Sequence, residues 1–201
     1  MSMQKVTVAG GGVLGSQIAL QSAYKGFDVT MWLRSEGSIE RTRPKLERLR
    51  GIYKQTLEAL KTDPSAYCRG LTDSADVPAK KLDELIAQVD AAFDGLTLTT
   101  DKEEAFGDAD LVIEAIAEVI DEKDAFYTSI RDLLPERTIL CTNSSTLLPS
   151  AMASFTGRPE KFLALHFANN IWKQNTAEVM GTPQTSPEAY AQVWSSRAPS
   201  G

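Results

Sequence analysis

The chain has 201 residues, 24% of them charged, and a formal net charge of −6. This length suits one α/β domain with a substantial core, or one domain and a short part of another. The charges are spread along the chain, which argues against a nucleic-acid-binding protein. Because no apolar run is long enough to span a membrane and no signal peptide precedes the first predicted strand, we expect a cytoplasmic protein with small-molecule partners.

Strand and helix patterns alternate in the first half of the chain. Short apolar runs rich in β-branched residues predict strands, and apolar residues at helical spacing predict helices. The predicted strands cover residues 5–10 and 28–33, and the predicted helices cover residues 14–26, 36–61 and 77–93. A polar turn region joins the last two helices, and the first three elements form a β-α-β unit.

The same alternation continues in the second half of the chain. Strands are predicted over residues 95–100, 109–118 and 137–145, and helices over residues 101–106 and 121–134. Two further strand-like runs, 161–169 and 175–181, are joined by a short polar segment, which predicts a hairpin or closely paired edge strands. Strands that alternate with helices predict an α/β fold with a doubly wound, mainly parallel sheet.

The two cysteines, Cys68 and Cys141, lie far apart in the sequence. Two cysteines at such a separation are weak evidence for a disulfide or a metal site. We therefore expect two free thiols and no bound metal.

Three spaced glycines, Gly10, Gly12 and Gly15, lie between the first predicted strand and the first predicted helix. In this context the first glycine allows a tight turn, the second allows a pyrophosphate to approach, and the third allows close packing of helix on strand. The backbone amides at the helix start, at Val13 and Leu14, would face the anion. The motif predicts a Rossmann-type domain that binds a dinucleotide, the alternative being a glycine-rich turn without a ligand.

The end of the second predicted strand bears on which dinucleotide is bound. NAD-binding domains usually have an Asp or Glu there, which accepts hydrogen bonds from the adenosine ribose. Leu33 cannot accept such bonds, whereas Arg34 and Ser35 could bind a 2′-phosphate. These residues favour NADP(H). Two alternatives stay open: Glu36 takes the role of the acid, or Arg34 is a solvated surface charge.

Polar residues stand in several motifs further along the chain. These are the run LVIEAIAE at 111–118, Asn143-Ser144-Ser145, His166-Phe167 and Glu178. Together with the glycines, they resemble the amino-terminal domain of the 3-hydroxyacyl-CoA dehydrogenase family, and the runs NSSTLLPS and NTAEVMGT are most similar to its diketoreductase-type members. The resemblance covers residues 4–193. It implies NAD(H) as the default cofactor, a β-hydroxyacyl-CoA or a β-keto or diketo compound as the substrate, and a homodimer for full-length members.

The only histidine, His166, has a side chain suited to proton transfer near neutral pH. Glu178, on the strand predicted to pair with it, could bind one ring nitrogen and stabilise the imidazolium. The resemblance implies that these two residues form the catalytic acid–base dyad. Ser145, at the end of a predicted strand, would bind the reacting oxygen and lie close to the cofactor. Without the resemblance, a structural histidine is the more common case.

The resemblance also implies supporting roles for other polar residues. Asn143 would assist catalysis, and Asn169 would lie near the nicotinamide end of the cofactor. Glu118 and Lys123 match positions that contact the cofactor, although Lys123 could instead be a solvated helix residue that pairs with nearby acids.

Two further residues have open alternatives. Ser144 and Ser145 could form a helix cap. Trp172 could line a substrate pocket or anchor a strand edge.

The resemblance stops near the end of the chain. Family members continue into a helical second domain, whereas residues 194–201 read WSSRAPSG and do not resemble the family. We expect a Rossmann domain over residues 1–193 and a non-family tail over residues 194–201, which a frameshift or premature stop would explain. Two functions stay open: an oxidoreductase that transfers a hydride between a nicotinamide and C3 of the substrate, and a truncated, inactive nucleotide-binding fragment.

Little in the sequence identifies the substrate. Lys45, Arg48 and Lys54, on the long predicted helix, could contact the phosphates of coenzyme A, but charged helix surfaces are common. The run HFAN at 166–169 differs from the more usual family motif and favours a small carbonyl substrate without coenzyme A.

Overall fold

The computed structural model describes residues 3–196. Its strands form one seven-stranded sheet, and successive side chains of each strand point to opposite faces of it. The strand order is β3-β2-β1-β4-β5-β6-β7. The strands are β1 (Lys5–Ala9), β2 (Asp28–Trp32), β3 (Thr97–Thr99), β4 (Leu111–Glu114), β5 (Ile139–Thr142), β6 (Phe162–Phe167) and β7 (Ala177–Gly181). Strands β1 to β6 are parallel and β7 is antiparallel, which confirms the predicted doubly wound, Rossmann-type sheet.

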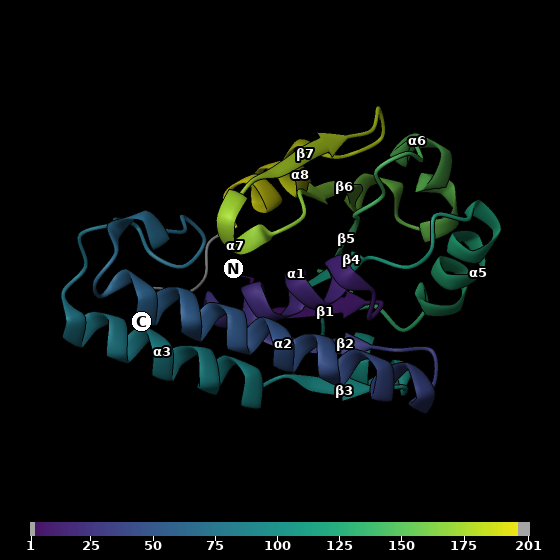
Figure 1. Ribbon diagram of the computed structural model, residues 1–201. Coiled ribbons are helices and arrows are strands. Elements are labelled where there is room, and N and C mark those ends of the chain that lie inside the picture. Colours follow the sequence, from purple (N-terminus) through teal and green to yellow (C-terminus); the bar gives the residue numbers. More distant parts are fainter. Residues whose placement is uncertain (1–2, 197–201) are drawn as a thin grey trace.

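Helices cover both faces of this sheet (Figure 1). The helices are α1 (Val13–Tyr24), α2 (Glu36–Leu60), α3 (Ala79–Asp94), α4 (Lys102–Phe106), α5 (Ile120–Ile130), α6 (Pro149–Met152), α7 (Ile171–Gln174) and α8 (Pro187–Trp194), with 3-10 turns at Pro64–Ala66, Ala153–Thr156 and Pro159–Lys161. Helices α1, α2, α3, α7 and α8 contribute to the core on one face, and α4, α5 and α6 to the core on the other.

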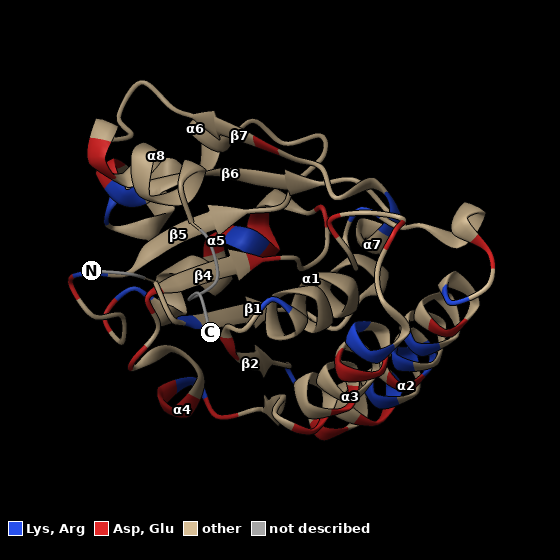
Figure 2. Cartoon of the chain, turned by 90° about the vertical axis from the view of Figure 1, so that its left-hand side faces the viewer, with Lys and Arg blue, Asp and Glu red and all other residues tan. Residues whose placement is uncertain are grey.

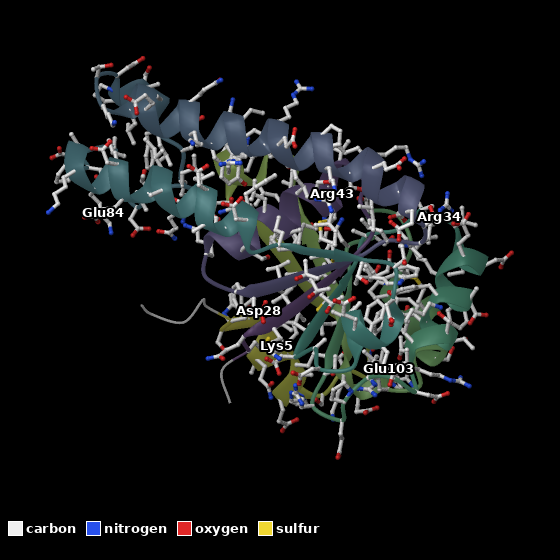
Figure 3. All side chains as sticks on the ribbon, turned by 90° about the horizontal axis from the view of Figure 1, so that it is seen from below. Lys5, Asp28, Arg34, Arg43, Glu84 and Glu103 are labelled. Carbon is white, nitrogen blue, oxygen red and sulfur yellow. The ribbon has the colours of Figure 1, made fainter. Side chains whose placement is uncertain are left out.

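Helices α2 and α3 form a long pair that packs over α1 and extends beyond the sheet (Figures 1 and 3). The buried residues of α2 recur every three or four positions, so one face of the helix enters the core. Its other face carries charged residues (Figure 2). Arg50 and Lys54 both bind Asp90 of α3, at 2.6 Å and 2.7 Å. The predicted coenzyme A contact Lys54 is therefore engaged within the helix pair.

An aromatic cluster fills the opposite face of the sheet. Phe126 lies 5.4 Å from Trp32, 5.8 Å from Phe106 and 5.4 Å from Tyr127, measured between ring centroids. Tyr127 in turn makes an edge contact with Phe162 at 5.5 Å. Each such pair contributes about 0.5–1.5 kcal/mol beyond the burial of its surface. The cluster anchors α4 and α5 to β2 and β6.

The predicted elements differ from the structure mainly at their ends. Strand β4 ends at Glu114, although the apolar run predicted a strand to residue 118. There the backbone passes close to the glycine loop, since a Cβ built at Gly10 would lie 2.5 Å from the carbonyl oxygen of Ala115. Strands β6 and β7 pair as predicted, but the segment between them forms the short helix α7.

Trp172 anchors α7 to the long helix. Its side chain is buried and its ring lies 5.8 Å from that of Tyr53 on α2. The backbone carbonyl of Trp172 also accepts a hydrogen bond from the amide of Gly70 at 2.9 Å. Trp172 therefore belongs to the core and anchors α7, which leads into the edge strand β7.

The cysteines are free, as predicted, within the described part of the chain. Both are buried, and burial raises the pKa of the Cys68 and Cys141 thiols. Helix α8 includes Trp194, the first residue of the predicted tail, while residues 197–201 of that tail lie outside the described residues. Among residues 3–196, no helix is both long enough and apolar enough to cross a membrane.

Two glycines give opposite predictions for an added methyl group. A Cβ at Gly15 of α1 would lie 2.2 Å from the backbone oxygen of Gly10, so Gly15→Ala should lower the free energy of unfolding by about 1–3 kcal/mol. Apart from the adjoining backbone of α2, no atom of the described chain lies within 4 Å of a Cβ at Gly51, so Gly51→Ala should raise the free energy of unfolding by about 0.5–1 kcal/mol. Urea unfolding followed by circular dichroism measures both changes. Equal stabilities would contradict the close packing of α1 on the glycine loop.

Candidate active site

A cleft of about 670 Å³ opens at the carboxyl ends of β1 and β4. These two neighbouring strands lead to helices on opposite faces of the sheet, and this is where ligands bind in open α/β sheets. The lining residues are Gly10–Gly12, Trp32–Arg34, Ser38, Arg41, Thr42, Lys45, Lys102, Ala115–Ala117, Glu122, Ala125, Phe126 and Ser129. The cleft has the size of a small-molecule or cofactor site.

The glycine loop has the geometry that an anion site requires. Gly10 adopts a φ of 116°, which glycine alone adopts readily. No atom of the described chain lies within 4 Å of a Cβ built at Gly12, so this position is open to an approaching ligand. Helix α1 begins at Val13 and Leu14, and no described side chain caps its first turn. Its first amides are therefore available to a phosphate.

Helix α2 forms one wall of the cleft. Ser38, Arg41, Thr42 and Lys45 recur at the spacing of one helix face and all line the cleft. The Lys45 ammonium donates to the carbonyl oxygen of Gly11 at 2.7 Å. The Thr42 hydroxyl donates to the carbonyl oxygen of Ser38 at 2.7 Å and lies 3.3 Å from the Gly11 oxygen. Lys45 thus lines the cleft, and its contact with coenzyme A phosphates stays a prediction. We did not predict this wall of the cleft, although the helical spacing of its polar residues was visible in the sequence.

Basic and hydroxyl groups gather where β2 ends and α2 begins. Leu33 is buried, and Arg34, which follows it, lines the cleft near the first turn of α2 (Figure 3). The hydroxyl of Ser38 lies 3.0 Å from that of Ser35 and accepts a hydrogen bond from the Arg41 guanidinium at 3.0 Å. The two arginines therefore lie at the start of a 25-residue helix, whose dipole also favours anions.

Glu36 is turned toward another part of the molecule. Its carboxylate accepts a hydrogen bond from the Thr100 hydroxyl at 3.4 Å, beyond the end of β3. Glu36 is not one of the described residues that line the cleft. The geometry thus gives little support to Glu36 as the ribose-binding acid.

Three predicted catalytic side chains form a hydrogen-bonded line at the same edge of the sheet. Ser145 Oγ lies 3.0 Å from His166 Nε2, and His166 Nδ1 lies 3.0 Å from Glu178 Oε2. His166 and Glu178 stand directly opposite each other in the β6–β7 pair, and Ser145 follows β5. Side-chain exposure is 26% for His166 and 65% for Glu178, so the line is open to solvent in the described chain.

The hydrogen-bond partners define which ring nitrogen carries the proton. A carboxylate only accepts hydrogen bonds, so His166 Nδ1 donates to Glu178. In the neutral imidazole Nε2 is then an acceptor, and the Ser145 hydroxyl donates to it. This tautomer presents a basic nitrogen beside a hydroxyl, which is the arrangement that proton transfer to or from a substrate oxygen needs.

The turn that carries Ser145 is held by Glu118. Its carboxylate accepts from the Ser144 hydroxyl at 2.6 Å and from the Ser145 amide at 3.4 Å. The Ser144 hydroxyl accepts in turn from the amide of Leu147 at 2.9 Å. The helix-cap alternative for these serines is wrong, because α6 begins only at Pro149.

The other predicted polar residues lie in three different environments. The buried Asn143 accepts from the amide of Phe167 at 2.9 Å, which ties the ends of β5 and β6 together beside His166. Asn169 is exposed on the loop between β6 and α7. Lys123 is fully buried and donates to Glu114 at 2.6 Å. Lys123 is therefore not a solvated helix residue, and its contact with the cofactor stays a prediction.

The chain resembles known dehydrogenases along almost its whole length. Residues 5–197 match the family model described as 3-hydroxyacyl-CoA dehydrogenase, NAD binding domain. The human mitochondrial hydroxyacyl-coenzyme A dehydrogenase is 28% identical over 189 residues, which are 94% of this chain and 54% of that protein. The chain therefore spans about half the length of this relative.

Solved structures give the same result. A diketoreductase, described as catalysing reactions of dicarbonyl compounds, is 41% identical, with a TM-score of 0.80 over 96% of this chain and 60% of its own. The 3-hydroxybutyryl-CoA dehydrogenase of Escherichia coli K12 is 25% identical, with a TM-score of 0.73 over 96% of this chain and 35% of its own. From the match over residues 5–197, the chain belongs to the family of 3-hydroxyacyl-CoA dehydrogenase NAD-binding domains.

Proposed function

We propose that this chain is the nucleotide-binding domain of an oxidoreductase. The enzyme would transfer a hydride between a nicotinamide cofactor and C3 of a β-hydroxy or β-keto substrate. The observation that carries the proposal is the hydrogen-bonded line from Ser145 through His166 to Glu178. It lies at the carboxyl ends of β5 and β6, at the edge of the sheet that also holds the cleft.

The cleft residues fit a nicotinamide dinucleotide. The open position at Gly12 and the uncapped start of α1 in the described chain suit a pyrophosphate. The bound cofactor would supply or accept the hydride. In the oxidation direction, His166 Nε2 would take the proton of the substrate hydroxyl while Ser145 orients its oxygen. Glu178 would stabilise the resulting imidazolium, and in the reduction direction the imidazolium would return the proton.

The relatives support two substrate classes. The names of the human and bacterial relatives specify acyl-coenzyme A compounds, whereas the diketoreductase acts on dicarbonyl compounds. The higher identity to the diketoreductase favours a small β-keto or diketo compound, as does the run HFAN at 166–169. A homodimer remains a prediction from the family resemblance.

We further propose that the cofactor is NADP(H). Arg34 and Arg41, together with Ser38, offer a 2′-phosphate two guanidinium groups and a hydroxyl at the start of α2. Arginine binds phosphate through paired, charge-assisted hydrogen bonds. Leu33 occupies the strand end where an acid would bind the ribose, and Glu36 contacts Thr100 instead.

A second candidate is a nucleotide-binding domain without turnover of its own. The exposure of Glu178 favours it, because solvent weakens the interaction between a carboxylate and an imidazolium. Turnover of a β-keto thioester or a diketo ester by the purified chain would exclude this candidate.

Arg34→Ala tests the choice of cofactor. Loss of a charge-assisted contact costs about 1.5–3 kcal/mol, so the dissociation constant for NADPH should rise about ten- to a hundredfold. The value for NADH should stay the same. Fluorescence titration with each dinucleotide measures both constants.

Arg43→Ala is the matched control, because Arg43 is exposed on α2 and is not among the described residues that line the cleft. It should leave both constants unchanged. Tighter binding of NADH than of NADPH by the wild-type chain would contradict the NADP(H) proposal.

His166→Gln tests the acid–base role. Since general acid–base catalysis contributes about 10²–10⁴-fold, kcat should fall by that factor while the affinity for NADPH stays the same. Turnover is measured with acetoacetyl-coenzyme A and with a diketo ester, and affinity by fluorescence. Unchanged turnover in the variant would remove His166 from the mechanism. If the wild-type chain binds the cofactor but shows no turnover, the result would support a nucleotide-binding domain without activity of its own.

A further inference from the structure

Glu114 is a carboxylate buried at the end of β4, outside the line of catalytic side chains. Its side chain and that of Lys123 have exposures of 0% and 1%. A buried carboxylate is costly unless donors surround it. One oxygen accepts from the Lys123 ammonium at 2.6 Å and from the Ile116 amide at 2.8 Å.

The other oxygen of Glu114 accepts from two hydroxyl groups. Tyr127 donates at 2.9 Å and Thr142 at 2.8 Å. Burial, together with the adjacent Glu114 carboxylate, raises the pKa of the Tyr127 phenol well above its usual range, so its hydroxyl remains a donor. Four donors from three segments of the chain therefore converge on one carboxylate.

One of these contacts fixes the wall of the cofactor cleft. The amide of Ile116 belongs to the segment 115–117, which lines the cleft. Within this segment, the amide of Ala115 donates a hydrogen bond to the carbonyl oxygen of Ala9 at 2.8 Å. The backbone of Ala115 also lies close to Gly10 of the glycine loop. The Glu114 carboxylate thus sets how the backbone leaves β4 toward the cofactor site.

Another contact leads to the catalytic serine. Thr142 donates to Glu114 and its hydroxyl also accepts from the amide of Ser144 at 3.2 Å. The backbone oxygen of Glu114 accepts from the amide of Asn143 at 2.8 Å. Ser145, which comes next, reaches His166. A short path of hydrogen bonds therefore joins the buried carboxylate to the turn that presents the serine.

We infer that Glu114 is a positioning residue, whose carboxylate holds the cleft wall at Ile116 and the turn of Ser145 in register with each other. Lys123 is the counter-ion of this carboxylate. The inference rests on the proposed function, because it assumes that Ser145 and His166 act together at the bound cofactor.

Thr142→Val and Tyr127→Phe form a matched pair of variants. Each removes one buried hydroxyl that donates to the same oxygen of Glu114, but only the Thr142 hydroxyl also holds the serine turn. Both should lose about 1 kcal/mol of stability. Only Thr142→Val should disturb the contact between Ser145 and His166.

The single histidine makes this contact visible without turnover. Two-bond proton–nitrogen correlation spectra of the ¹⁵N-labelled chain report the His166 Nε2 resonance, and Ser145→Ala identifies the shift that follows loss of the hydroxyl. Thr142→Val should shift Nε2 in the same direction. Tyr127→Phe should leave it in place, and both variants should keep the wild-type affinity for NADPH.

The double variant Glu114→Gln/Lys123→Met tests the cleft wall. It removes both buried charges together, so no unpaired ion is left, while the amide of Gln accepts through one oxygen only. The double variant should keep the wild-type circular dichroism spectrum. It should bind NADPH and NADH more weakly to the same degree, and its His166 Nε2 resonance should shift. Unchanged affinity for both dinucleotides would overturn the link to the cleft wall.

The outcomes separate this inference from the proposed function. If Ser145→Ala leaves the Nε2 resonance unmoved, the proposed active-site contact is wrong, and the positioning role is overturned with it. If Ser145→Ala shifts the resonance but Thr142→Val does not, only the positioning role of Glu114 is overturned. An equal shift in Tyr127→Phe would likewise show that the carboxylate has a structural role alone.

Discussion

The candidate site depends on the direction of the strands. Because β1 to β6 run parallel, their carboxyl ends lie at one edge of the sheet, and the loops that follow them meet there. The glycine loop after β1, the cleft wall after β4 and the serine turn after β5 come from segments far apart in the sequence. Each is anchored by a strand buried on both faces, so the edge is held by the hydrophobic core.

The antiparallel strand β7 supplies the carboxylate that lies beside His166. Side chains directly opposite each other in an antiparallel pair lie on the same face and within reach. This register places Glu178 against His166, although twelve positions separate them in the chain. Helix α7 occupies the connection, and the burial of Trp172 against Tyr53 fixes where the returning strand begins. Packing on α2 thus bears on the geometry of the acid–base pair.

Several features of the site could be predicted from local patterns. Glycine spacing and a strand before a helix predicted the loop of Gly10 and Gly12, and the strand end predicted the place of Ser145. His166 was singled out as the only histidine, and the family resemblance implied its role. The role of Lys123 could not be predicted in this way, since a lysine in a helix with several acids is usually solvated. Only the position of Glu114 beneath the same helix explains its burial, and that position depends on packing between β4 and α5.

The sequence by itself determined the order of strands and helices, the doubly wound class and the family, because hydrophobic periodicity and short motifs are local properties of the chain. The tertiary structure alone decided which polar groups share a surface. Lys45 and Thr42 meet Gly11, and Glu36 turns away to Thr100, because helix α2 packs in one orientation over the glycine loop. Such contacts join residues distant in sequence, so they follow from the packing of whole elements and not from any local pattern.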